Sequence, residues 1–165
     1  MIKRKEVEKE FIRAIGENQG ILHKICFVYA DSKLDREDLY QDIIFQLWKS
    51  YSSFKGRSKF STWIYQVALN TAITKVRRRK ALPSGREFSE EIYSPTIAMD
   101  YSEDLRILYQ AISYLSKVEK ALILMWLDEK SYKEMSATLG MSEKNVSVSL
   151  VRIKRKLTDL IKKLQ

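Results

Sequence analysis

The chain has 165 residues, a formal net charge of +9 and a single cysteine. One cysteine excludes an internal disulfide and suits a reducing cytoplasm. The longest apolar run, residues 121–127, is too short to span a bilayer, and the N-terminus lacks a signal-peptide core. We therefore expect no membrane insertion, and the excess of positive charge favours a polyanionic partner.

Apolar residues recur with helical spacing along the whole sequence, and no alternation typical of strands is found, which predicts an all-α fold. A first helix is expected over residues 3–16, and Gly16 together with Gly20 is expected to end it. A second helix is expected over residues 21–29. The apolar stripe of the first helix consists of Val7, Phe11, Ile12 and Ile15.

A third helix is predicted to begin at Asp35, which fits the N-cap position, with Glu37 and Asp38 favourably placed in the first turn. Its inward stripe consists of Leu39, Ile43 and Leu47. The residues that fall partly on other faces are Gln41, Asp42, Phe45 and Trp48. An outward aromatic residue beside carboxylates is typical of a surface that docks another protein.

The stretch from residue 43 to residue 86 holds ten Lys or Arg, seven aromatic residues and no acidic residue. Cations beside rings suit a surface that follows a phosphate backbone and stacks unpaired bases. The same rings could instead fill a core between amphipathic helices, with the cations merely solvated. The absence of acids favours the nucleic-acid surface, because an ordinary solvated face mixes both signs.

Residues 51–59 are predicted to form a mobile loop, after which Ser58 or Ser61 would cap a long helix that runs to about Lys80. The expected buried stripe of that helix is Phe60, Ile64, Val67, Ala68 and Thr71. Its opposite side offers Gln66, Asn70, Thr74, Arg77 and Arg78. These are hydrogen-bond formers and cations of the kind that meet base edges and phosphates.

Residues 81–104 contain both prolines, one basic residue and six acidic residues, which marks a flexible acidic linker. The segments on either side are basic, with net charges of +8 over residues 1–80 and +6 over residues 105–165. Two basic modules joined by an acidic connector favour a polyanion that is gripped at two places.

The second module opens with two predicted helices, whose apolar residues are Leu105, Leu108, Ile112 and Leu115, then Val118, Leu122, Met125 and Trp126. Ser131 with Glu134 forms a capping box that starts a short helix. Gly140 suits the left-handed residue that closes this helix, and Ser142 caps a final one. A short helix, a glycine turn and a longer helix over about residues 131–157 predict a helix-turn-helix.

The outer side of the final helix carries Lys144, Ser147, Val148, Val151, Arg152 and Arg155. Base readout usually occurs near the start of such a helix, where Ser142, Lys144, Asn145 and Ser147 lie. The cations further along, Arg152, Lys154 and Arg155, are more typical of phosphate contacts. A plain three-helix bundle with a basic surface would have the same spacing.

With both modules laid out, the chain resembles bacterial sigma factors of the sigma-70 family, and most of all their two-domain extracytoplasmic-function (ECF) group. Residues 38–48, DLYQDIIFQLW, are similar to the family's polymerase-docking helix, and residues 59–70, KFSTWIYQVALN, to the start of its promoter-melting and minus-ten helix. Similarity to the family's minus-thirty-five-binding domain is found in residues 115–120, 131–136 and 140–157.

The resemblance implies two helical domains joined by a flexible acidic linker. A four-helix sigma region 2 would cover residues 1–81, the linker residues 82–104, and a sigma region 4 with the helix-turn-helix residues 105–165. Such a protein is not an enzyme. It joins core RNA polymerase, recognises the minus-thirty-five and minus-ten promoter elements and helps to open the DNA.

The resemblance also implies a role for particular residues. The clamp coiled coil of the largest polymerase subunit would be met by Asp38, Gln41, Asp42, Phe45 and Trp48. Minus-ten DNA would be met by Phe54, Lys55, Arg57, Lys59, Phe60, Asn70, Thr74, Arg77 and Arg78. Minus-thirty-five DNA would be met by Ser142, Lys144, Asn145, Ser147, Val148, Arg152 and Arg155. The second domain would also bind the polymerase flap, an anti-sigma factor is a further expected partner, and the free chain is expected to be a monomer.

Two other functions stay open. A stand-alone helix-turn-helix transcriptional regulator would use residues 1–80 to sense or dimerise, and would bind a palindromic site as a stable dimer. A metal-bound nuclease would use the carboxylates Asp31, Asp35, Glu37, Asp38 and Asp42, although capping and surface roles explain them as well. His23 and Cys26 are spaced like half a metal site, but the sequence has no other His or Cys to complete it. We therefore expect no metal and no cofactor.

Overall fold

The computed structural model describes residues 1–81 and 102–165, and all regular structure in these two ranges is helical, as the sequence predicts. The elements of the first range are α1 (Ile2–Glu17), α2 (Gln19–Tyr29), α3 (Lys33–Ser50), the 3-10 helix η1 (Tyr51–Ser53) and α4 (Phe60–Ala81). Those of the second range are α5 (Glu103–Ser113), α6 (Lys117–Leu127), α7 (Tyr132–Leu139) and α8 (Glu143–Leu164). Most of the predicted linker lies outside the described residues.

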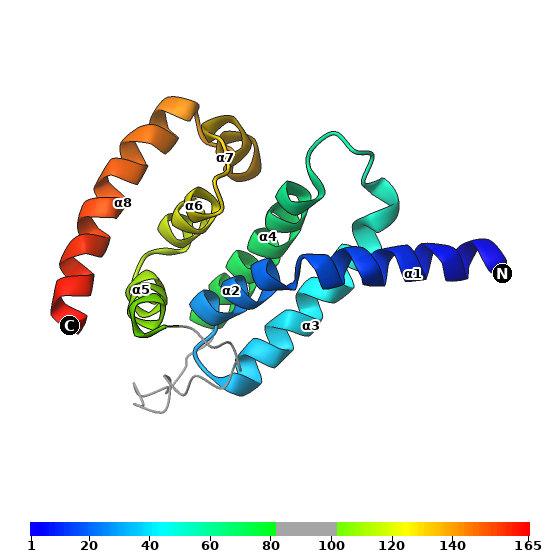
Figure 1. Ribbon diagram of the computed structural model, residues 1–165, viewed down its shortest axis with the longest axis horizontal. Helices are drawn as coiled ribbons and strands as arrows, with labels where there is room; N and C mark the ends of the chain where they lie inside the picture. Colours follow the sequence, from blue (N-terminus) through cyan, green and yellow to red (C-terminus); the bar gives the residue numbers. More distant parts are fainter. Residues whose placement is uncertain (82–101) are drawn as a thin grey trace.

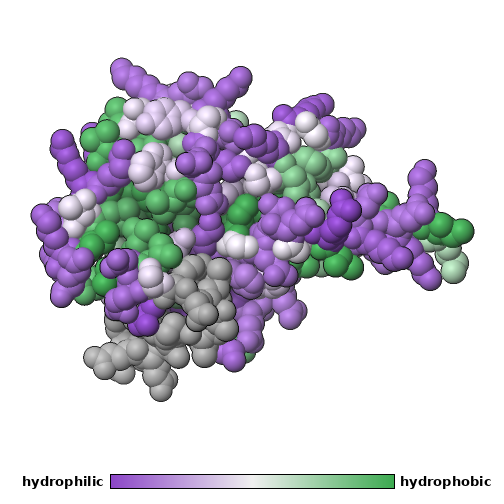
Figure 2. All heavy atoms as spheres, in the orientation of Figure 1, coloured by the Kyte–Doolittle hydropathy of each residue, from purple (hydrophilic) through white to green (hydrophobic). Residues whose placement is uncertain are grey.

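The first domain packs α2, α3 and α4 against one another, while α1 projects from this body (Figure 1). The buried residues of α1 are Phe11 and Ile15. Ile12, which the periodicity places on the same stripe, is 68% exposed, because little of the projecting helix has a neighbour to cover it. Figure 2 shows hydrophilic residues along most of this helix and hydrophobic atoms at its tip, where Met1 and Ile2 are exposed.

Two predicted helix boundaries in the first domain are wrong. The interruption between α1 and α2 falls at Asn18, so Gly16 and Gly20 both lie inside helices. The N-cap of α3 is Ser32, whose hydroxyl accepts a hydrogen bond from the backbone N–H of Asp35. Asp35 itself lies in the first turn and is buried.

The second domain confirms the local signals of the helix-turn-helix. Ser131 and Glu134 form a reciprocal capping box at the start of α7, and Ser142 caps α8. Gly140 closes α7 in the left-handed region with φ 67°, which a residue with a side chain rarely adopts. Ser116 and Glu119 form a second capping box, at the start of α6, that the sequence analysis missed.

The two domains pack directly on each other. In Figure 1, α6 lies between α8 and α4, and it contacts α2 and α4 of the first domain as well as α5, α7 and α8 of its own. All five residues from Ala121 to Met125 are consequently buried. Val118 and Trp126, predicted to lie on the inward stripe of α6, are 45% and 37% exposed, because they flank this wrapped segment rather than lie within it.

Helix α4 is likewise buried on two sides. The single stripe predicted for it is too narrow, since Thr62, Trp63 and Tyr65 are buried together with Ile64. One side of α4 packs on α2 and α3, and the other meets α6 and α7. Ser61 lies within its first turn, where its hydroxyl accepts a hydrogen bond from Lys130 of the second domain.

Candidate nucleic-acid interface

The aromatic residues at the start of α4 pack on one another. The ring centroids of Phe54 and Trp63 are 5.1 Å apart, those of Phe54 and Phe60 are 5.4 Å apart, and Tyr51 lies 6.3 Å from Trp63. Trp63 is 8% exposed, whereas Phe54 and Phe60 are half-buried. The rings therefore hold the 51–59 segment against α4 and leave two partly exposed faces beside it.

The loop that this cluster supports presents cations to solvent. Lys55, Arg57 and Lys59 are all exposed, and Gly56 provides the turn between them with φ 69°. Three cations beside two half-buried rings match the chemistry of single-strand binding, in which phosphates pair with cations and bases stack on rings.

A groove of about 720 Å³ runs between α3 and α4. It is lined by Asp38, Asp42, Phe45, Gln46, Asn70, Thr71, Thr74, Lys75, Arg78 and Arg79. The groove brings three of the five predicted polymerase contacts together with three of the nine predicted minus-ten contacts. We call it the α3–α4 groove.

Ion pairs cross this groove. The Lys75 ammonium donates hydrogen bonds to a carboxylate oxygen of Asp38 and, at 2.6 Å, to one of Asp42. Arg79 donates to the buried Asp35 at 2.8 Å. Three of the five carboxylates considered for a nuclease thus pair with cations of α4. The part of the chain that the structure describes holds no cluster of acidic, His and Cys residues suited to a metal ion.

The predicted docking face of α3 is open at its centre. Gln41 is exposed and Phe45 is 60% exposed. Trp48 is half-buried, because its ring packs on Phe11 of α1 at a centroid distance of 5.0 Å. Trp48 therefore links α1 to α3, and Phe45 is the aromatic residue that is available to a partner.

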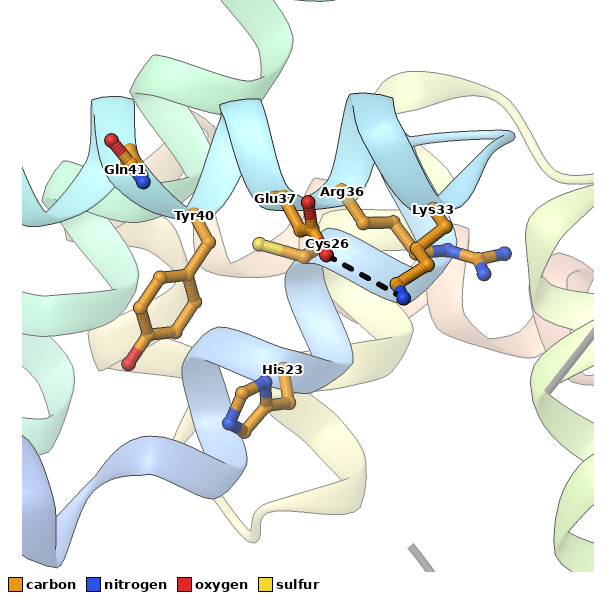
Figure 3. Close-up of a pocket in the computed structure, with 7 residues that line it drawn as sticks. All are labelled: His23, Cys26, Lys33, Arg36, Glu37, Tyr40 and Gln41. Carbon is orange, nitrogen blue, oxygen red and sulfur yellow. Dashed lines mark ion pairs between the residues drawn. The ribbon is translucent and has the colours of Figure 1, made fainter. Parts of the chain in front are cut away.

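A second cavity, of about 300 Å³, opens between α2 and α3. Figure 3 shows that α2 contributes His23 and Cys26, while α3 contributes the remaining lining residues. His23 stacks on Tyr40 at a centroid distance of 5.2 Å. Burial raises the pKa of the Cys26 thiol to about 12, so this side chain stays protonated and does not act as a thiolate ligand.

The outer face of α8 carries the residues predicted for minus-thirty-five DNA. All of them are exposed except Ser147, which is half-buried. Lys154 lies over the ring of Trp126 at 4.8 Å, a cation–π contact that holds it against α6. Arg152 and Arg155 remain as exposed cations on this face.

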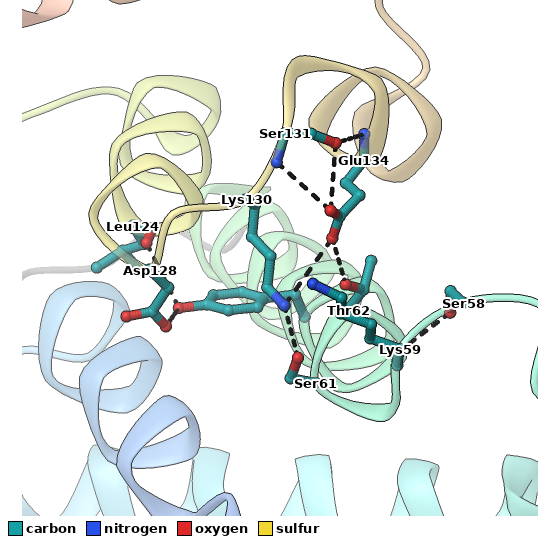
Figure 4. A network of polar contacts seen from close by, with 10 residues as sticks. Ser58, Lys59, Ser61, Thr62, Leu124, Asp128, Lys130, Ser131 and Glu134 are labelled. Atoms are coloured by element: carbon teal, nitrogen blue, oxygen red, sulfur yellow. Dashed lines mark hydrogen bonds and ion pairs between the residues drawn. The ribbon is translucent and has the colours of Figure 1, made fainter.

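The polar contacts between the two domains are not predicted from the sequence. They join Lys24, Tyr29, Ser61, Thr62 and Tyr65 of the first domain to Lys117, Leu124, Asp128, Lys130 and Glu134 of the second. Thr62 donates a hydrogen bond to Glu134 at 2.6 Å, and Lys130 donates one to Ser61 at 2.5 Å. Both hydrogen bonds are drawn as dashed lines in Figure 4. Asp128 accepts from Lys24 at 2.6 Å and from the hydroxyl of Tyr65. Burial raises the pKa of that hydroxyl, and its hydrogen bond to Asp128 raises it further.

Comparison with known proteins identifies both halves of the chain. The family described as Sigma-70 region 2 matches residues 14–82, and the family described as Sigma-70, region 4 matches residues 105–157. The ECF RNA polymerase sigma factor SigM of Bacillus subtilis is 30% identical over 134 residues, which cover 75% of this chain and 78% of SigM. The chain belongs to the ECF sigma factors of the sigma-70 family.

Other relatives of this ECF sigma factor differ in length. The ECF RNA polymerase sigma factor SigG of Mycobacterium tuberculosis is 28% identical over 161 residues, and the match covers 80% of this chain but 43% of SigG. The chain thus spans less than half the length of that relative.

Solved structures show the same fold. The sigma factor RpoE of Bartonella quintana, in complex with the anti-sigma factor NepR, matches with a TM-score of 0.70 at 20% identity and covers 96% of this chain and 98% of its own. CnrH, in complex with the cytosolic domain of CnrY, matches with a TM-score of 0.66 at 18% identity over 94% of this chain and 89% of its own.

Proposed function

We propose that this ECF sigma factor binds core RNA polymerase, recognises the minus-thirty-five and minus-ten elements of its promoters and helps to open the DNA. The observation that carries the proposal is the presence of both sigma-70 regions, in order, at residues 14–82 and 105–157. We assign polymerase docking and minus-ten recognition to residues 1–81, the connector to residues 82–104 and minus-thirty-five recognition to residues 105–165.

Run-off transcription with purified core polymerase tests this function. The template is DNA that the chain occupies in its native cell, and the expected result is a promoter-specific transcript that appears only when the chain is added. A stand-alone regulator gives the opposite pattern, with no gain of transcript and a stable dimer on a palindromic duplex. Sedimentation of the free chain, which we expect to be a monomer, provides the second measurement.

Docking on core polymerase is assigned to the exposed face of α3. The support is an exposed Phe45 beside the exposed Gln41 and the carboxylates of Asp38 and Asp42. The double variant Gln41→Ala/Phe45→Ala should weaken co-purification with core polymerase by about tenfold, as loss of an interface anchor does. Ile12→Ala removes an apolar side chain from α1 that is 68% exposed, compared with 60% for Phe45, and should leave binding unchanged.

Recognition of the upstream element is assigned to α8. Arg152 is an exposed cation, so Arg152→Ala should weaken promoter binding by a similar factor for every upstream sequence. Asn145 lies in the first turn of α8, so Asn145→Ala should change which sequence is preferred. An equal loss across all upstream sequences for Asn145→Ala would refute its part in base readout.

An anti-sigma factor is the proposed regulatory partner, and the support is that the sigma factor RpoE of Bartonella quintana, which shares this fold, was solved in complex with the anti-sigma factor NepR. A sigma factor acts where the polymerase is, which places this chain in the cytoplasm. Among the helices that the structure describes, none has both the length and the apolar character needed to cross a membrane. Isolating the tagged chain from its native cell, with and without induction, tests whether a partner other than polymerase is bound.

A further inference from the structure

Lys75 occupies an unusual position for a cation on the DNA-binding helix. It lies on α4, among the residues that line the α3–α4 groove, but its ammonium is turned to the carboxylates of Asp38 and Asp42 on α3. The Lys75 side chain is only 20% exposed, whereas Asp38 and Asp42 are 62% and 51% exposed. The cation is therefore covered, while the carboxylates that cover it are open to another molecule.

The charge state of Lys75 fits this arrangement. Burial by itself would lower the pKa of Lys75, but hydrogen bonds to Asp38 and Asp42 outweigh the burial and raise it. The ammonium thus stays charged, and two of its three donors are occupied. An ion pair with half-exposed carboxylates contributes little to stability, so a competing cation can exchange with Lys75 at little cost.

The neighbouring cation behaves differently. Arg79 pairs with Asp35, whose side chain is only 8% exposed, so no partner can reach that carboxylate without separating α3 from α4. The pair of Arg79 and Asp35 is therefore part of the packing between the two helices. Lys75, one helical turn earlier, is the cation of this groove whose partners a protein docking on α3 can reach.

The groove also places Lys75 beside the proposed minus-ten contacts. Asn70, Thr74 and Arg78 follow one another at helical spacing along α4 and line the same groove. A phosphate that approaches these three residues comes within reach of the Lys75 side chain once its ammonium turns away from α3. The α3 wall of the groove therefore belongs to the proposed docking face, and the α4 wall belongs to the proposed DNA-binding face.

We propose that Lys75 is a further ligand for the phosphates of the opened promoter strand, that Asp38 and Asp42 mask it in the free chain, and that a cationic side chain of the docking partner unmasks it by pairing with these two carboxylates. The inference rests on the proposed docking of α3 on core polymerase. It couples the two events, since DNA contact by Lys75 becomes favourable only after docking.

The masking is tested on the full-length chain without polymerase. In the variant Asp38→Asn/Asp42→Asn the carboxylates lose their charge at nearly unchanged volume, so Lys75 is released. Its affinity for a fluorescent single-stranded oligonucleotide of mixed sequence should rise by about threefold at low salt, with a salt dependence steeper by about 0.7 in logarithmic slope, as expected for one added phosphate contact. Adding Lys75→Gln to this variant should remove the gain.

A matched control separates masking from net charge. Glu6→Gln/Glu10→Gln removes two exposed carboxylates from α1 and raises the net charge by the same amount. If this control gains as much affinity as Asp38→Asn/Asp42→Asn, or if the gain persists in the triple variant with Lys75→Gln, the masking is refuted. The far-UV circular dichroism spectrum of each variant verifies that its helical fold is retained.

The release is tested on reconstituted holoenzyme. Lys75→Gln should bind core polymerase at least as tightly as the natural chain, because it frees Asp38 and Asp42, but it should open a promoter several-fold more slowly in a permanganate footprint. Opening at the natural rate would overturn the release. If the natural chain itself fails to bind core polymerase, the proposed function fails, whereas the oligonucleotide measurement still decides the masking.

Discussion

The two sides of α4 are held by opposite kinds of polar contact. On the side facing the second domain, Thr62 and Tyr65 are 6% and 0% exposed and donate hydrogen bonds to Glu134 and Asp128. On the side facing α3, Lys75 pairs with carboxylates that are more than half exposed. The same helix is thus fastened to the second domain by covered contacts, whereas at Lys75 it is fastened to α3 by contacts that water and ions can reach.

This difference decides which contacts can change during function. A buried hydroxyl that loses its partner bears the full cost of desolvation, about 1–3 kcal/mol, so the domain interface resists piecemeal opening. An exposed ion pair is replaced by water or by another ion at little cost. We therefore expect the domain interface to set stability and the α3–α4 groove to set binding, and four measurements test that division.

The largest effect is expected from Tyr65→Ala. The side chain is completely buried at the domain interface, so its removal leaves a cavity and should lower the free energy of unfolding by about 3–5 kcal/mol. Urea unfolding followed by circular dichroism measures this. Phe45→Ala, which truncates an aromatic residue that is 60% exposed, should cost less than about 0.5 kcal/mol. Similar costs for the two variants would contradict the division.

Tyr65→Phe sharpens the comparison by keeping the ring and removing only the hydroxyl. Asp128 then retains Lys24 as its partner but loses the hydrogen bond from Tyr65. Because a hydrogen bond to a charged group is lost at a buried site, the free energy of unfolding should fall by about 1–2 kcal/mol. A change within the error of the urea titration would show that this hydroxyl does not hold the two domains together.

Lys75→Gln should change stability least among the substitutions on α4. Its partners are exposed, so we expect a loss of at most about 1 kcal/mol in the free energy of unfolding, and a smaller one at high salt, where exposed ion pairs are screened. The same urea titration measures it, at low and at high salt. A loss as large as that of Tyr65→Ala would make Lys75 a structural residue and remove the reason to regard it as exchangeable.

The pH dependence of stability should differ in direction between the two sides. The hydrogen bond from Thr62 lowers the pKa of Glu134 below 4.5, so its contribution is present above pH 4.5 and is lost as the pH falls through the lower folded value. Lys75 has a raised pKa, so its contribution is present below pH 10.5 and is lost as the pH rises through the higher folded value. The free energy of unfolding of Glu134→Gln, Lys75→Gln and the natural chain, measured through the acidic and the alkaline pH range, gives the two contributions. If both contributions were lost at the same end of the pH scale, the assigned pKa directions would be contradicted.

The local part of this structure is readable from the sequence. Ser131, Glu134, Gly140 and Ser142 act within a few residues of their own positions, so the caps and the turn of the helix-turn-helix follow from spacing alone. The outward position of Phe45 on α3 and of Arg152 on α8 follows from helical periodicity for the same reason.

The non-local part is not readable in this way. Glu134 is predicted as a cap, but its bond to Thr62 joins residues 72 positions apart. Local spacing favours Asp35 as an N-cap and cannot reveal its partner Arg79, which lies 44 positions away. Lys75 is one of the ten cations of the stretch from residue 43 to residue 86, and only the packing of α3 on α4 distinguishes it from the others. The sequence signal for Lys75 is the spacing of Asp38 and Asp42 by one helical turn. This signal can be used only once it is known that α4 packs against α3.

The wrapping of α6 by both domains affects any attempt to divide this protein. Residues 121–125 are covered from two directions, so a fragment that begins at residue 102 would display an apolar ridge that α2 and α4 normally conceal. Such a fragment should self-associate or precipitate, even though its own caps and turn are intact. Dividing the chain at the acidic connector is therefore a poor way to produce the second domain alone. A soluble fragment will require polar substitutions at residues 121–125.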